Sequence, residues 1–100
     1  MRDLFSAGRR RSRRIPATIP IRLVVESEGL KLELESSTVD LSFHGVKVRT
    51  RVVLLPGETV GMVTEGDIRH AISARVVWVQ RAGTDLWSLA GLEFLETRPA

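Results

Sequence analysis

The chain has 100 residues, 43% of them hydrophobic, and a formal net charge of +3. This length fits one domain, and the hydrophobic fraction is enough to close one core. Cysteine is absent, which excludes disulfides, thiolate metal sites and cysteine nucleophiles. No stretch approaches the roughly 20 consecutive apolar residues of a membrane-spanning helix, and residues 1–14 lack the apolar run of a secretory signal. We therefore expect a cytoplasmic protein with no membrane partner.

Basic residues are concentrated at the N-terminus. Residues 1–14 hold six arginines and one aspartate, whereas residues 15–100 hold nine basic and eleven acidic side chains. Such a segment favours an anionic partner, because the planar guanidinium fork matches phosphate oxygens and the Hoogsteen edge of guanine. The same composition also fits a solvated tail that only aids solubility. Because residues 1–14 show no apolar periodicity, we predict a flexible basic arm there.

From Ile15 onward, apolar and polar residues alternate, which predicts half-buried β-strands. The predicted strands occupy residues 21–26, 30–35, 46–49, 59–64, 68–80 and 87–95, and turns are predicted at 27–29, 40–45, 54–58, 65–67 and 81–85. Six short strands without a convincing helix predict an all-β fold. A small six-stranded antiparallel β-barrel is favoured over an open sheet, because closure removes exposed edges. The barrel is assigned to residues 15–96 and a short tail to residues 97–100.

Few side chains offer acid, base, nucleophile or metal-ligand chemistry. His44 and His70 lie far apart, with no metal-ligand spacing around either. Asp40 and Ser42 could belong to a catalytic triad, but neither a strand-to-helix nucleophile elbow nor a suitably spaced histidine accompanies them. We therefore expect no enzymatic activity, no metal and no cofactor.

Two segments carry a family resemblance. Residues 9–16 read Arg-Arg-Arg-Ser-Arg-Arg-Ile-Pro and contain an Arg-x-x-x-Arg element as Arg10 and Arg14, directly before the first apolar residue of the barrel. Residues 40–45 read Asp-Leu-Ser-Phe-His-Gly, an Asp-x-Ser-x-x-Gly element. In this order and spacing, on an all-β chain of this length, the two elements resemble the PilZ domain family, whose receptors bind the second messenger cyclic di-GMP. The resemblance covers residues 9 to about 96, including the last two strands.

For the arm, the resemblance implies contacts with the phosphates and guanine Hoogsteen edges of cyclic di-GMP. Arg10 and Arg14 would make the main contacts. Cyclic di-GMP often binds this family as a stacked pair of molecules. The run of Arg9, Arg10 and Arg11 could contact the second molecule of such a pair.

For the turn, the resemblance implies that residues 40–45 recognise the guanine base. Asp40 would accept hydrogen bonds from N1–H and N2–H₂ of the base, and Ser42 would add a hydroxyl contact. Gly45 would permit either a positive φ or a close approach of the backbone to the ligand. An Asp-x-Ser pair before glycine is also a common turn former, which is the alternative interpretation of this segment.

Trp78 has two interpretations that the sequence leaves open. It shares strand parity with Ala74 and Val76, which predicts core packing, whereas the resemblance places a tryptophan there near guanine. Trp87 is expected in the core or at the barrel end. An exposed strand face is expected for Lys47, Arg49 and Arg51.

The sequence thus predicts a non-enzymatic receptor whose arm is reordered by cyclic di-GMP and thereby signals to a protein partner. One alternative is a PilZ adaptor that works by protein contacts without nucleotide. Another is a small-barrel nucleic-acid binder, which is disfavoured because no exposed aromatic row is evident and the body is slightly acidic. Many relatives carry a C-terminal helix that caps the barrel, and no such helix is predicted in residues 96–100, which leaves open how ligand binding is transmitted.

Overall fold

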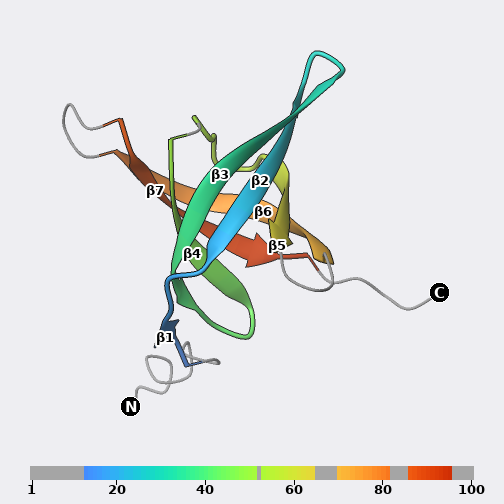
Figure 1. Ribbon diagram of the computed structural model, residues 1–100. Helices are drawn as coiled ribbons and strands as arrows, with labels where there is room; N and C mark the ends of the chain where they lie inside the picture. The colour runs from blue at the N-terminus through green and yellow to red at the C-terminus, as the bar shows by residue number, and fades with distance from the viewer. Residues whose placement is uncertain (1–12, 52, 65–69, 82–85, 96–100) are drawn as a thin grey trace.

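A computed structural model describes residues 13–51, 53–64, 70–81 and 86–95. These residues form one antiparallel sheet (Figure 1). Its strands are β1 (Ile15–Pro16), β2 (Pro20–Ser27), β3 (Leu30–Leu41), β4 (Gly45–Thr50), β5 (Thr59–Thr64), β6 (His70–Arg81) and β7 (Ser88–Phe94). Within the described residues there is no helix with the length and apolar character needed to cross a membrane.

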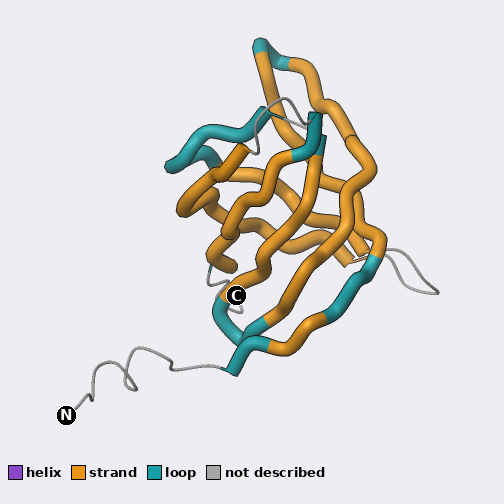
Figure 2. Tube along the Cα trace, turned by 90° about the vertical axis from the view of Figure 1, so that its left-hand side faces the viewer, coloured by secondary structure: helices purple, strands orange, loops and turns teal. Residues whose placement is uncertain are grey.

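Six of the strands close into a barrel. The hydrogen-bonded order is β3-β2-β5-β6-β7-β4, and β4 pairs back onto β3. The additional strand β1 pairs with the end of β3, where Ile15 lies opposite Leu41 and Pro16 opposite Asp40. Figure 2 shows the closed barrel from the side. The predicted all-β, six-stranded antiparallel barrel is confirmed, with one short strand added at its N-terminal side.

Some strand boundaries differ from the prediction. β3 extends to Leu41, so Asp40 belongs to a strand and the turn begins only at Ser42. Of the strand predicted at 68–80, residues 70–80 belong to β6, and residues 68–69 lie outside the described residues. The predicted turn at 65–67 and most of the turn at 81–85 lie outside the described residues. The longer β3 matters for the site, because it holds Asp40 in the sheet instead of in a loop.

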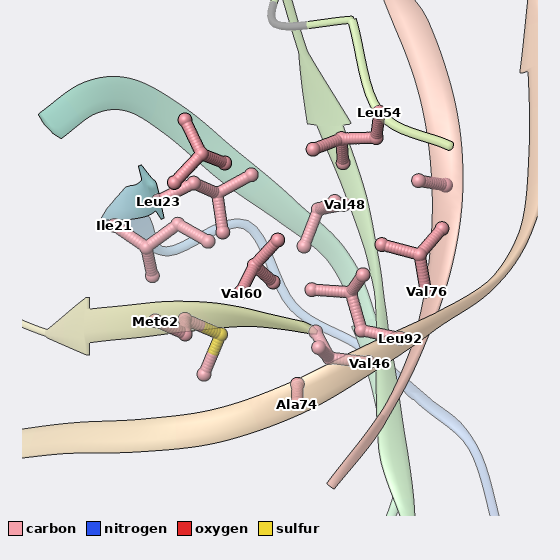
Figure 3. Close-up of a cluster of buried hydrophobic side chains, with 12 residues drawn as sticks. Ile21, Leu23, Val46, Val48, Leu54, Val60, Met62, Ala74, Val76 and Leu92 are labelled. Atoms are coloured by element: carbon pink, nitrogen blue, oxygen red, sulfur yellow. The ribbon is translucent and has the colours of Figure 1, made fainter. Parts of the chain in front are cut away.

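The core follows from the period-two alternation of the strands. Side chains that point inward from β2, β4, β5, β6 and β7 form one buried cluster (Figure 3). Leu23, Val46, Val48 and Ala74 are among its fully buried members. These aliphatic side chains meet across the barrel because alternate residues of each strand share one face.

Two β-bulges interrupt the alternation. The register of β3 against β4 shifts between Thr38 and Asp40, and that of β6 against β7 shifts between Val76 and Trp78. A bulge adds one residue to a strand, so the side chains beyond it exchange faces. Trp78 therefore points outward and is 36% exposed, although Val76 is buried. The core interpretation of Trp78 is wrong, because strand parity does not hold across the bulge.

Candidate functional site

The segment that leads into the barrel is hydrogen-bonded to β3 near the C-terminal end of that strand. Thr38 donates its hydroxyl proton to the carbonyl of Ala17 and accepts a hydrogen bond from the Ile19 amide at 2.8 Å. The Ala17 amide donates to the Val39 carbonyl at 3.1 Å, and the Thr38 amide to the Ile19 carbonyl at 3.0 Å. Together with the β1 pairing, these bonds fix the chain that directly follows Arg14.

Ser42 organises the turn between β3 and β4. Its amide donates to the Gly45 carbonyl at 2.9 Å, which closes the turn. Its hydroxyl oxygen accepts from the amides of His44 and Gly45 at 3.3 and 3.1 Å and lies 3.2 Å from the Gly45 carbonyl oxygen. These are the local bonds expected of a serine that forms a turn. Ser42 therefore has a structural role, in addition to any contact with a ligand.

Asp40 lies between two cations on the outer face of the barrel. Its Oδ1 is 3.4 Å from Nε of Arg14, and its Oδ2 is 3.6 Å from Nζ of Lys47. Arg14 also donates from Nη1 to the Ser42 hydroxyl at 3.4 Å. The Asp40 side chain is only 16% exposed, and its Oδ1 is shielded from solvent and accepts no hydrogen bond from the described residues. The site thus holds a carboxylate with spare acceptor capacity beside two positive charges.

Gly45 is required by the packing of the sheet. A Cβ at this position would lie 2.3 Å from the Leu92 carbonyl oxygen of the neighbouring strand β7. Its φ is not in the left-handed region, where only Gly29 and Gly57 are found among the described glycines. Of the two reasons expected for a glycine here, positive φ is therefore wrong, and the close backbone approach is to β7.

A row of residues at matched register crosses four strands of the outer face. Asp40 on β3 lies opposite Lys47 on β4, Lys47 opposite Gly91 on β7, and Gly91 opposite Trp78 on β6. The Trp78 ring covers Gly91 so closely that a Cβ there would lie 2.1 Å from the indole Nε1. Because Gly91 has no side chain, the indole can lie directly over β7, with a basic and an acidic group farther along the row.

A second aromatic group lies beside this row. The guanidinium carbons of Arg49 and Arg51 are 4.7 and 5.6 Å from the centroid of the Trp87 ring, which places both within cation–π range. Arg49 and Arg51 are exposed, as predicted, while Lys47 is half-buried against Asp40. Trp87 is half-buried on the outer face with these arginines rather than in the core.

The structure brings together several of the residues proposed from the sequence. Arg14 contacts both Asp40 and Ser42, and Gly45 closes the same turn. Trp78 lies on the same face, separated from Asp40 by β4 and β7. Arg9 and Arg10, together with the rest of the arm up to residue 12, lie outside the described residues.

Two residues of the site were not singled out from the sequence. Lys47 was assigned to an exposed face, although its ion pair with Asp40 makes it a neighbour of the turn. Gly91 could not be singled out from the sequence. Its role, to leave room for the Trp78 ring, depends on its position opposite Trp78 on the neighbouring strand. Among the described residues, no group of three or more His, Cys, Asp or Glu side chains could hold a metal ion.

The family of the chain is decided by comparison with known domains. The PilZ domain family model matches residues 8–100. The chain belongs to the PilZ family. The resemblance carried by the arm and the turn is therefore confirmed at the level of the family. A search of curated proteins finds no match.

Solved PilZ structures share the barrel. The PilZ domain of CeSA from a cellulose-synthesizing bacterium has 27% identity and a TM-score of 0.63, and the alignment covers 87% of this chain and 84% of that one. The PilZ domain of Escherichia coli YcgR with c-di-GMP has 19% identity and a TM-score of 0.65, covering 91% and 81%. The Bacillus subtilis inhibitor of motility MotI/DgrA has 16% identity and a TM-score of 0.62, covering 89% of this chain and 44% of that one. The last two comparisons show the fold alone.

Substitutions at the glycines test how far the outer face depends on close packing. Gly45→Ala should lower the free energy of unfolding by about 1–3 kcal/mol, because the new methyl group meets a backbone carbonyl that cannot move without disturbing the sheet. Gly61→Ala is the matched control, since its Cβ would meet Val24 at an ordinary 3.4 Å. Urea denaturation of both variants provides the measurement. Equal stability of the two would contradict the packing role of Gly45.

Proposed function

We propose that this PilZ domain is a non-enzymatic receptor for cyclic di-GMP. The observation that carries the proposal is the Asp40 carboxylate, held in the sheet between Arg14 and Lys47 with one shielded oxygen that accepts no hydrogen bond from the described residues. Buried polar atoms are normally hydrogen-bonded, so an oxygen that has only the ion pair with Arg14 keeps acceptor capacity for a ligand donor that displaces or shares that arginine. The N1–H and N2–H₂ groups of guanine are such donors.

The charges around Asp40 suit the remainder of the ligand. Arg14 and Lys47 are about a third to a half exposed, so both can reach an anion at the surface. Planar guanidinium groups bind phosphate in a bidentate manner, and lysine adds a compact positive charge. A base bound by Asp40 would thus have cations next to the phosphates that follow it.

Trp78 offers an apolar plane on the same face. Its indole lies over Gly91 and keeps about a third of its surface exposed. Bases stack on aromatic side chains, at roughly 1–3 kcal/mol per base in single-stranded nucleic-acid complexes. In our proposal Trp78 contacts a guanine, as the family resemblance implies.

Relatives support the class of ligand and the kind of output. Two Escherichia coli YcgR structures of this fold are complexes with c-di-GMP, and MotI/DgrA is an inhibitor of motility. We propose that the ligand, as one molecule or a stacked pair, draws residues 1–14 onto the barrel through Arg9, Arg10 and Arg14. The reordered arm then changes the surface offered to a protein partner.

Ligand selectivity tests the proposal first. Calorimetry with the full chain should show micromolar or tighter binding of cyclic di-GMP and much weaker binding of cyclic di-AMP, because adenine lacks the N1–H and N2–H₂ donors that Asp40 would accept. Single-stranded DNA titrated at several salt concentrations covers the nucleic-acid alternative, which predicts a steep salt dependence. Equal affinity for the two dinucleotides would refute the role of Asp40. No binding of either would favour the adaptor alternative.

The arginines of the arm provide a second prediction. Arg10→Ala and Arg14→Ala should each weaken binding of cyclic di-GMP by about 2–5 kcal/mol, the usual cost of removing one partner of a buried charged hydrogen bond. Arg22→Ala is the matched control, because Arg22 also pairs with carboxylates, those of Glu33 and Glu35 on the β2–β3 hairpin. If all three variants bind alike in calorimetry, the arm makes no specific contact.

Limited proteolysis tests the proposed reordering. Saturating cyclic di-GMP should markedly slow trypsin cleavage after Arg10 and Arg13, because phosphates that neutralise the arginines remove their mutual repulsion and anchor the segment. Cleavage after Arg81, an exposed residue at the end of β6, serves as the internal control and should change little. An unchanged rate in the arm with ligand bound would exclude this switch even if calorimetry confirmed the binding.

A further inference from the structure

The β2–β3 hairpin extends beyond the closed part of the barrel (Figure 1). β3 pairs with β4 only from Ser36 onward, and β2 pairs with β5 only over residues 21–24. Residues 30–35 of β3 are therefore paired with β2 on one side and with no described strand on the other. A two-residue turn joins the strands, with positive φ at Glu28 (52°) and Gly29 (81°). Among the described residues, the edge of β3 away from β2 is thus unpaired over residues 30–35.

This edge is apolar on one face and charged on the other. Leu30, Leu32 and Leu34 are 67%, 48% and 37% exposed. They share a face with core residue Leu23, which lies opposite Leu34. Lys31 and Glu33 project from the opposite face. Open edge strands are usually protected by proline, a bulge or inward-pointing charges, because they can pair with another chain. Residues 30–35 contain neither proline nor a bulge, and their charges all lie on the outward face.

The order of these side chains makes the edge complementary to itself. When two copies are placed antiparallel with Leu32 opposite Leu32, Leu30 of each copy lies opposite Leu34 of the other. On the charged face, Lys31 of each copy then lies opposite Glu33 of the other. Opposite charges and apolar pairs at facing positions stabilise antiparallel strands, whereas like charges destabilise them.

The neighbouring register is less favourable. A shift that places Glu33 opposite Glu33 brings two carboxylates together at the centre, and it leaves Leu30 opposite Ser36 instead of Leu34. Lys31 would then face Glu35 instead. The charge pattern therefore selects the register centred on Leu32.

We propose that two copies of the chain associate through these edges, extending the sheet from one hairpin into the other. The occupant is a second copy because the edge matches its own sequence in both charge and apolar pattern. The inference is independent of nucleotide binding, since the hairpin tip shares no residue with the site around Asp40.

Charge exchange tests the dimer directly. Sedimentation velocity of the full chain over a concentration series should show reversible dimerisation. Lys31→Glu gives the edge only acidic groups at its two central charged positions, and Glu33→Lys gives it only basic groups. Each variant alone should therefore raise the dissociation constant about tenfold or more. An equimolar mixture of the two should restore dimers as heterodimers, because every facing charge pair is then attractive.

Glu35→Lys is the matched control. It makes the same charge change on the same face of β3, but in the proposed register Glu35 faces Gly29 of the other copy, so the dissociation constant should change little. Circular dichroism of each variant checks that the barrel is folded, because Lys31 and Glu33 also have neighbours within the hairpin, in Glu26 and Arg22. A parent chain that stays monomeric at every concentration overturns the proposal. So do single variants that dimerise like the parent, or a mixture that fails to restore the dimer.

Discussion

The outward direction of Asp40 and Trp78 is imposed by the two β-bulges, at Val39 in β3 and at Val77 in β6. Without them, Asp40 would have the inward parity of Thr38, and Trp78 that of Val76, both of which are buried. Bulges are frequent near functional sites because they redirect a side chain without breaking the sheet. In this barrel they place a carboxylate and an indole on one outer surface while leaving the core aliphatic.

The outward position of Asp40 also determines which charged groups surround its carboxylate. A carboxylate that is 16% exposed loses much of its hydration, which is unfavourable unless cations are near. Arg14 and Lys47 supply them from opposite sides, one from the segment before β1 and one from β4. Because the Thr38 hydroxyl fastens the segment after Arg14 to β3, the end of the basic arm is held at the site. The fold therefore brings Arg14 of the arm motif to the turn motif through β3.

The barrel was predictable because alternation is a strong local signal, and Leu23, Val25, Val46 and Val48 of β2 and β4 obey it. The association of Arg14 with Asp40 and Ser42 was predictable only through the spacing of two motifs, since nothing local shows that β1 pairs with the end of β3. The position of Trp78 was not predictable from parity, because the β6 bulge depends on the register with β7 rather than on the sequence of β6 alone. Lys47 and Gly91 acquire their roles only from the strands beside them.

In our proposal Asp40, its cations and Trp78 form one binding surface, and amide and indole chemical shifts on titration with cyclic di-GMP test this most directly. We expect the largest changes at Arg14, Asp40, Lys47, Gly91 and the Trp78 indole N–H, with residues 30–35 of the hairpin unaffected. The indole N–H of Trp87, which lies with Arg49 and Arg51, should change less than that of Trp78. Saturable binding with its main changes on the hairpin or around Trp87, and none at Asp40 and Trp78, would contradict the proposed site.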